Sequence, residues 1–406
     1  MASNRWIGFT VVFLASITIA MNQFKVPPVM VEMMGALNLD MVAGGMVMSV
    51  YALTVIILVF PAAFVLSKIG AKTTGLVAIG CSAVGPLLGV LTSNFHFLLI
   101  SRVIEGVGSA FISVVAPTII ARSFNAKERG KPMGIWAGWV PIGVVLIFNL
   151  AVPLCTIFGG WRSLWWCCAG LNTIFFILFL IFIEKDTPAS VSRSDTQKTG
   201  SGLSAFKNVA ILALGLAFFG TAFRDVGFST WAPKYFQDVL SIGASRANFL
   251  NSFAYLVQLV GTIVGGMLID RGVSRKVLLM VSGVSTAVVA AFSFSLPALW
   301  ILPFMFVVGL MAGFIVISCF TGAAGESADP SEIPWAVAIA NFGCFLAIMI
   351  APVAVGAMVE SKGWGAGTLV VEIGAMVVIL AGLVYARFSR CEKNMAPASE
   401  GNFQGC

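Results

Sequence analysis

Twelve long stretches of apolar residues, separated by short polar segments, make up most of this 406-residue chain. Most of them approach or exceed the roughly 20 residues that a helix needs to cross the hydrocarbon core of a bilayer. The pattern therefore predicts an all-α membrane protein with twelve transmembrane helices. The expected spans are residues 6–33, 41–66, 74–93, 97–121, 133–158, 164–183, 208–236, 246–269, 277–296, 299–324, 335–359 and 367–388.

One longer polar stretch, 184–207, separates the first six spans from the last six. It is rich in Ser, Thr, Gly and charged residues, which is the composition of a linker. We therefore expect an N-terminal bundle over 1–183, a cytoplasmic linker over 184–207, a C-terminal bundle over 208–390 and a cytoplasmic tail over 391–406.

The two halves also repeat one another, because a shift of 203 residues aligns the same features at four separate places. The aligned pairs are Leu66–Lys68 with Ile269–Arg271, Gly106 with Gly309, Trp139 with Phe342, and Gly160–Trp161 with Gly363–Trp364. Two parallel halves with a site at the membrane midplane between them are one known plan of secondary transporters. The repeat predicts two pseudo-symmetric six-helix bundles.

Composition and charge fit this interpretation. Hydrophobic residues make up 59% of the chain and charged residues 10%, which excludes a soluble globular protein. Of the 24 Lys and Arg, 17 fall in the segments that share a side with the N-terminus, and four fall in the opposite loops. The positive-inside rule then predicts that both termini are cytoplasmic. The first span is too long for a cleaved signal peptide, so it is expected to remain as a helix.

Two segments resemble motifs of the major facilitator superfamily. Residues 265–276, Gly-Gly-Met-Leu-Ile-Asp-Arg-Gly-Val-Ser-Arg-Lys, resemble the family's loop motif, and residues 66–72 are a degenerate copy of it. Residues 99–110 resemble the fourth-helix motif, with Glu105 in the place of the family's Gln. The resemblance implies the twelve-helix fold, alternating access, and a location in the plasma (inner) membrane, but it does not specify the cargo.

Charged residues at the ends of the second and eighth spans are candidates for a cytoplasmic gate. A carboxylate there can pair with Arg across the cytoplasmic face and hold one conformation closed. The alternative is that basic inner loops only set the topology. The gate candidates are Asp270, Arg271, Arg275 and Lys68, and the first-half copy is weaker because Ser67 replaces the acid.

Three basic residues, Lys25, Arg102 and Arg224, lie inside the predicted spans. An ionisable residue at membrane depth is costly unless it faces a partner or a cavity, so it indicates function. Arg102 and Glu105 share one helix face, and they form either a static ion pair or a proton relay.

Arg224 and its neighbour Asp225 point in different directions on an ideal helix, so we expect that they need not pair. Lys25 precedes two prolines, which break the helix and expose carbonyls where a cavity is lined. Lys25 and Arg224 fall at nearly equivalent positions of the two halves, so they predict a two-sided clamp for an anion. For Lys25 the alternative is a side chain that reaches the outer interface.

Polar and aromatic residues inside the apolar spans complete the predicted binding site. Amides are costly against lipid, whereas the aromatic residues are as well explained by packing. The candidates beside the two cations are Asn22, Gln23, Tyr51, Tyr255, Gln258, Trp139, Asn149, Asn341 and Phe342.

The sequence therefore predicts a secondary transporter of a small organic anion, expected to be a carboxylate, with proton symport through Glu105, Arg102 or Asp225. The main alternative is a proton-coupled drug or metabolite exporter, and a sensor with a transporter fold is a weaker one. No enzyme motif, nucleotide-binding loop or metal-ligand spacing occurs, and the eight Cys do not suggest a disulfide framework. We expect no cofactor and no nucleic acid, and we expect a monomer in the lipid bilayer.

Overall fold

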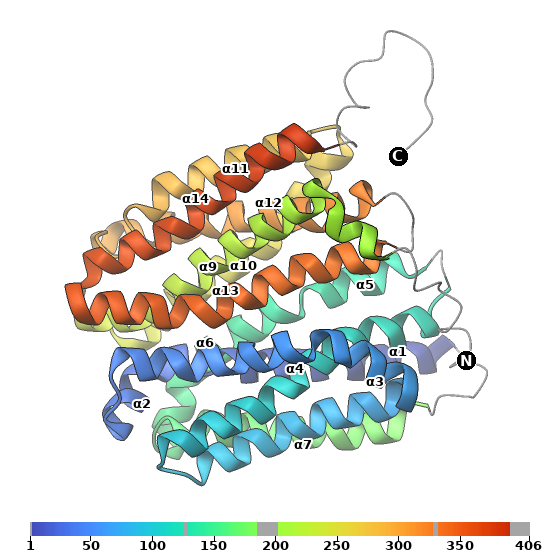
Figure 1. The fold of residues 1–406 in the computed structure, drawn as a ribbon. Helices are drawn as coiled ribbons and strands as arrows, with labels where there is room; N and C mark the ends of the chain where they lie inside the picture. The colour runs from blue at the N-terminus through green and yellow to red at the C-terminus, as the bar shows by residue number, and fades with distance from the viewer. Residues whose placement is uncertain (1, 126–127, 185–201, 328–331, 390–406) are drawn as a thin grey trace.

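The computed structural model describes residues 2–125, 128–184, 202–327 and 332–389, and within these residues every regular element is a helix. Figure 1 shows two groups of helices, with α1–α4 and α7 below and α9–α14 above. Helix α6 runs between them and contacts both α1 and α10. Helices α1 and α9 begin, and α7 and α14 end, at one end of the molecule, which we call the linker end.

The helices of the first group are separated by short turns. They are α1 (Ala2–Phe24), η1 (Pro27–Val29), α2 (Met30–Leu37), α3 (Met41–Val90), α4 (Phe95–Ser123), α5 (Gly130–Ala137), α6 (Trp139–Phe158) and α7 (Arg162–Phe182).

The second group follows the same plan. Its elements are η2 (Gly202–Lys207), α9 (Val209–Asp238), α10 (Ala244–Asp270), α11 (Arg275–Ala290), η3 (Ala298–Trp300), α12 (Ile301–Glu326), α13 (Ile333–Lys362) and α14 (Trp364–Phe388).

Several predicted spans have different limits in the structure. The first is broken after Phe24 because Pro27 and Pro28 have no N–H to donate to the helix. The second and third share the label α3, but they are two helices that meet at Gly70, whose φ of 81° and ψ of 168° are not helical. The ninth, α11, ends at Ala290 and continues only as turns, so eleven described helical stretches are long and apolar enough to cross a membrane.

The repeat seen in the sequence corresponds to one packing contact that occurs twice. A Cβ on Gly106 of α4 would lie 2.7 Å from the Tyr51 carbonyl oxygen of α3. A Cβ on Gly309 of α12 would lie 2.2 Å from the Ala254 carbonyl oxygen of α10. Residues 51 and 254 differ by the same 203 positions as the two glycines. In each half, a glycine lets two helices approach at the same point, as small residues do in membranes.

Contacts between the two groups occur at the end away from the linker, where α2 lies in Figure 1. A Cβ on Gly45 of α3 would lie 2.8 Å from the Pro352 carbonyl oxygen of α13, and Gly356 approaches Met41 as closely. The Asn248 amide of α10 donates to the Pro28 carbonyl over 3.1 Å. The close approach therefore brings α3 against α13 and the broken first helix against α10.

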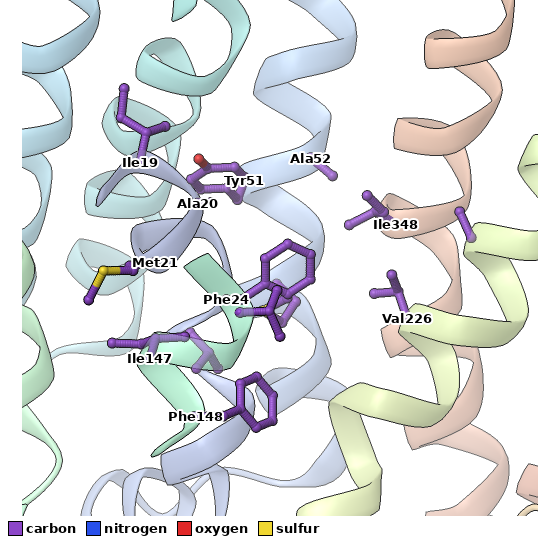
Figure 2. Close-up of a cluster of buried hydrophobic side chains, with 14 of the residues drawn as sticks. Ile19, Ala20, Met21, Phe24, Tyr51, Ala52, Ile147, Phe148, Val226 and Ile348 are labelled. Atoms are coloured by element: carbon purple, nitrogen blue, oxygen red, sulfur yellow. The ribbon is translucent and has the colours of Figure 1, made fainter. Parts of the chain in front are cut away.

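An apolar cluster continues from this contact towards the middle of the molecule. Figure 2 shows Phe24 of α1 beside Phe148 of α6, with Val226 of α9 and Ile348 of α13 on the opposite side. All four side chains are buried. The cluster includes Phe24, the last residue of α1, which directly precedes the buried charged residue Lys25.

Candidate functional site

Three charged side chains form a completely buried cluster in the first group of helices. Lys25, Arg102 and Glu105 each have 0% of their surface exposed. The Lys25 Nζ lies 2.9 Å from Glu105 Oε1, and Arg102 Nη1 donates to Glu105 Oε2. Lys25 also donates to Asn22 Oδ1 over 2.8 Å. With all three groups ionised, two cations share one carboxylate, and the cluster carries a formal charge of +1.

Arg102 also binds the backbone where the first helix breaks. Its Nη2 donates to the Gln23 carbonyl over 3.0 Å, and its Nη1 donates to the Asn22 carbonyl over 2.8 Å. In a regular helix the Gln23 carbonyl would accept from residue 27, but Pro27 has no N–H. Arg102 therefore supplies the donor that the proline removes, and its Nε binds Val47 on α3 over 3.0 Å.

Aromatic rings cover both cations of this cluster. The Lys25 Nζ lies 4.5 Å from the Trp165 ring centre, and the Arg102 guanidinium carbon lies 4.5 Å from that of Tyr51. Both distances are within the range of cation–π attraction, which is stronger when the cation is desolvated. The Asn22 amide donates to the Ser82 carbonyl over 2.8 Å and ties α1 to α3.

The second group of helices contains a small cavity, lined by residues of α9, α10, α11, α12 and α14. Arg224 and Asp225 of α9 line it and form an ion pair. The Nε and Nη2 of Arg224 lie 2.8 and 2.6 Å from the same oxygen, Asp225 Oδ1. These neighbours therefore do pair, although their positions on an ideal helix point about 100° apart.

Arg224 retains one donor group with no partner. Its Nη1 is buried and makes no hydrogen bond among the described residues. An unpaired charged donor in a buried site is costly, so this nitrogen is the strongest indication of a ligand in the cavity.

Helix α10 presents a polar stripe to the same cavity. Asn251, Tyr255 and Gln258 follow one another at helical spacing and all line it. The Tyr255 hydroxyl lies 2.9 Å from the Ser229 hydroxyl, and the Asn251 amide donates to the Ser229 carbonyl over 3.1 Å. Ser293 adds a hydroxyl from the turn after α11. The cavity therefore offers one cation and several neutral hydrogen-bonding groups.

A model of the Major Facilitator Superfamily matches residues 12–352 of the chain. The chain belongs to the major facilitator superfamily. Membership confirms the predicted fold class, and with the eleven described helical stretches that can cross a membrane it makes the chain a multi-pass membrane protein. The fold also resembles the crystal structure of a bacterial homologue of the human lysosomal transporter Spinster in an inward-facing and occupied conformation. That match has a TM-score of 0.77 and 15% identity, and it covers 97% of this chain and 98% of the other.

Three curated relatives in this superfamily carry transporter names. A probable anion transporter of Arabidopsis thaliana chloroplasts is 24% identical over 58% of this chain and 49% of its own length. A probable L-galactonate transporter of Escherichia coli is 24% identical over 67% and 64%. The hexuronate transporter of Bacillus subtilis is 20% identical over 87% of both chains. The chain thus spans about half the length of the first of these relatives and most of the third.

Only part of the predicted two-sided clamp faces the cavity of this superfamily member. Arg224, Asp225, Tyr255 and Gln258 line it together. Lys25 does not; it is held by Glu105 and Asn22 inside the first group. The structure therefore does not bring Lys25 and Arg224 to one cavity, because the buried carboxylate of Glu105 holds Lys25.

The other predicted binding residues take different positions. Asn22, Gln23 and Tyr51 surround the Arg102 cluster rather than the cavity. Trp139 is buried and stacks on Trp136 at a centroid distance of 5.9 Å. Asn149 is exposed and donates to the Ser252 hydroxyl of α10 over 2.9 Å, so it joins the two groups. Asn341 and Phe342 lie on α13 outside the cavity lining.

The residues of the predicted gate lie near the linker end and do not pair with one another among the described residues. Asp270 is exposed and, among the described residues, forms no ion pair with Arg271 or Arg275. Arg275 donates to the Thr321 hydroxyl over 3.3 Å. Lys68 is exposed and lies over the Phe64 ring.

Sequence analysis missed several residues of the site. Asn251 and Ser293 line the cavity, and Asn251 was detectable because it precedes Tyr255 by one helical turn. Outside the cavity lining, Glu372 is a single acid in the apolar run of α14, and its Oε2 is buried with no hydrogen-bond partner among the described residues. No group of three metal-ligating side chains occurs among the described residues, and their six cysteines are free thiols.

Proposed function

We propose that the protein transports a small organic anion, a carboxylate, by alternating access between the two groups of helices. The buried and unpaired Nη1 of Arg224 in the cavity is the observation that carries this proposal. A guanidinium nitrogen binds a carboxylate more strongly than a neutral acceptor, because the hydrogen bond joins opposite charges, and it repels a cationic cargo.

The rest of the cavity fits a hydroxylated carboxylate. Asn251, Gln258, Tyr255 and Ser293 supply neutral donors and acceptors around Arg224. Such groups recognise hydroxyls and discriminate strongly against analogues that lack them. The names of the relatives, an anion transporter, a hexuronate transporter and a galactonate transporter, support the same class of cargo.

The charge cluster of the first group supports this role from a distance. Its formal charge of +1 is buried in a medium of low dielectric constant, where it is screened little. We propose that Lys25 and Arg102 attract the anion through this field, while Arg224 makes the contact. We also propose that the coupling ion is a proton, held by Glu105 or Asp225, and that transport is symport.

The arrangement of the two groups gives the proposed direction of opening. The described contacts between α3 and α13 lie away from the linker end, and Asp270 is unpaired at the linker end. We propose that the linker end is cytoplasmic, with both termini on that side, and that this conformation faces inward. We further propose two bundles divided within 184–207, a bacterial-type inner or plasma membrane as the location, and a monomer as the working unit.

A ligand panel on the purified protein tests this function. The panel contains D-glucuronate, D-galacturonate, L-galactonate, simple mono- and dicarboxylates, inorganic phosphate and lipophilic cations, and thermal stability is the measurement. A ligand at a hundred times its Kd stabilises the folded state by about 2.7 kcal/mol.

We expect a carboxylate to raise the melting temperature of the wild-type protein and of Arg246→Ala, an exposed control on α10. We expect Arg224→Ala to abolish the shift and Arg224→Lys to weaken it, because Lys cannot offer the fork of Arg. Stabilisation by lipophilic cations alone would overturn the proposal in favour of an exporter.

A further inference from the structure

Trp231 is a tryptophan of α9 that lies where the two groups of helices meet, at the end away from the linker, which we call the α2 end. Its side chain has 0% of its surface exposed, and together with Trp165 it is the largest fully buried side chain among the described residues. The indole Nε1 donates to the Pro352 carbonyl of α13 over 2.9 Å. The polar edge of the ring therefore has its partner within the second group of helices.

Three glycines surround this ring and form what we call the glycine socket. A Cβ on Gly44 of α3 would lie 3.3 Å from Cη2 of the indole, and a Cβ on Gly356 of α13 would lie 2.8 Å from its Cζ2. A Cβ on Gly45 would lie 2.8 Å from the same Pro352 carbonyl oxygen that accepts the indole hydrogen bond. The socket is shared between the two groups, because Gly44 and Gly45 belong to the first and Gly356 to the second.

Two methionines of α2 reach the same glycine of α3. Met30 and Met34 are buried, and their Sδ atoms would lie 3.3 and 3.2 Å from a Cβ on Gly44. Thioether groups pack favourably against aromatic rings and adapt to irregular space. The indole therefore ends where α2, α3 and α13 come together.

The socket lies between the cavity and the α2 end. Arg224 and Trp231 are seven residues apart on α9, so they share one face of the helix and are about 10 Å apart along its axis. Phe228 lies between them and, like Arg224, lines the cavity. Because α9 begins at the linker end, Trp231 is on the side of the cavity nearer the α2 end (Figure 1). A path along this face of α9 from Arg224 to the α2 end therefore passes the indole.

We propose that Trp231 is a removable plug, which fills the glycine socket while the α2 end is closed and becomes accessible to water when the two groups separate at that end. The proposal rests on the proposed function, alternating access between these groups, and identifies the side chain that closes one end. One hydrogen bond and apolar contacts hold the indole, so its release breaks no ion pair. Glycine is required in the socket, because a larger residue at 44 or 45 would crowd the ring or push α3 away from α13.

A matched pair of glycine variants tests this inference without any cargo. Gly45→Ala places a methyl group 2.8 Å from a carbonyl oxygen of the other group, and Gly106→Ala places one 2.7 Å from a carbonyl oxygen within the first group. The two changes introduce similar strain, but only the first acts on the closed α2 end. Overpacking of this kind shifts an equilibrium about 5- to 150-fold, so Gly45→Ala should raise the open fraction at the α2 end by such a factor.

Hydroxyl-radical footprinting of the purified protein, read by mass spectrometry, measures the access of water to each tryptophan. The exposed Trp300 and the buried Trp165 serve as references within the same molecule. In the wild type and in Gly106→Ala, we expect Trp231 to be oxidised as slowly as Trp165. In Gly45→Ala, oxidation of Trp231 should be at least about fivefold faster and approach that of Trp300, while Trp165 stays protected.

Gel filtration confirms that each variant is folded, and Gly44→Ala, whose methyl group would lie 3.3 Å from the ring, is a second variant with the same expected direction. Wild-type protection of Trp231 in both folded socket variants would overturn the plug. Equal oxidation of Trp231 and Trp165 would also contradict it, because that result shows a general loss of packing rather than opening at one end.

A transport measurement separates this inference from the proposed function. Trp231→Ala should still bind D-glucuronate, because the indole does not line the cavity, but it should lose proton-driven accumulation in liposomes through a leak at the α2 end. The matched control Trp166→Ala, an exposed tryptophan of α7, should accumulate like the wild type. Wild-type accumulation by folded Trp231→Ala would overturn the plug while leaving the anion transporter intact. Failure of the wild-type protein to bind any anion would instead refute the proposed function, and the footprinting would still decide the plug.

Discussion

The buried cluster of the first group makes Glu105→Gln a sharp test of how the fold is held together. The change removes the carboxylate that Lys25 contacts at 2.9 Å and that Arg102 also contacts. Arg102 keeps three backbone carbonyls, whereas Lys25 keeps only the Asn22 oxygen and a ring face. Breaking a buried ion pair costs about 3–5 kcal/mol. A Gln oxygen can still accept one bond, so we expect a loss near 3 kcal/mol.

A double-mutant cycle separates this cost from simple repacking. Lys25→Met with Glu105→Gln removes the stranded ammonium, so the double variant should be more stable than Glu105→Gln alone. Reversible unfolding in mixed micelles measures each free energy, and Glu360→Gln serves as an exposed control. If Glu105→Gln lies within about 0.5 kcal/mol of wild type, the range of ordinary surface changes, the reasoning is refuted.

Three further substitutions test the backbone and the broken helix. Gly106→Ala places a methyl group 2.7 Å from an α3 carbonyl oxygen, so we expect the free energy of unfolding to fall by about 1–3 kcal/mol. Its melting temperature should be lower than that of the control Gly170→Ala, whose methyl group meets no atom within 4 Å. Gly160→Ala imposes a φ of 86° on a residue with a Cβ and crowds Glu32, so its melting temperature should also fall, by the equivalent of about 1–2 kcal/mol. Arg102→Lys keeps the charge but cannot bind three carbonyls, so it should lower stability more than anion affinity; loss of affinity at unchanged stability would contradict this role.

The all-α membrane architecture could be predicted from the sequence, because the ability of a segment to cross the membrane as a helix depends on its composition and length. The 203-residue shift predicted two similar halves, and the contacts of Gly106 and Gly309 show its physical cause, a shared point of close helix approach. The limits of the helices were less predictable. Pro27 ends α1 as its chemistry requires, but the exact point at which the two helices of α3 meet depends on the positive φ of Gly70, which an apolar pattern does not encode.

The site was only partly predictable, because a sequence shows which side chains are charged but not how they pair. Lys25 and Arg224 occupy nearly equivalent positions in the repeat, yet Glu105 holds the first and Asp225 the second. Lys25 and Glu105 are 80 positions apart in the sequence, so only the fold brings them together. Arg224 and Asp225 are neighbours, but their pairing depends on the rotamer of the Arg224 side chain.

Arg102 and Arg224 differ in how many of their hydrogen-bond donors have partners, and this difference gives them different roles in the proposed transporter. Every nitrogen of Arg102 has a partner, and three of its bonds go to backbone carbonyls, so it fixes the break in the first helix. In Arg224, Nε and Nη2 both bind Asp225 Oδ1, and the buried Nη1 of this cavity-lining residue has no partner among the described residues. Arg102 could bind cargo only if the hydrogen bonds that fix the break in the first helix were broken. Arg224 could take a new partner through a change of side-chain rotamer alone. Ligand and proton binding should therefore concentrate in the second group of helices, with the first group as its rigid, positively charged counterpart.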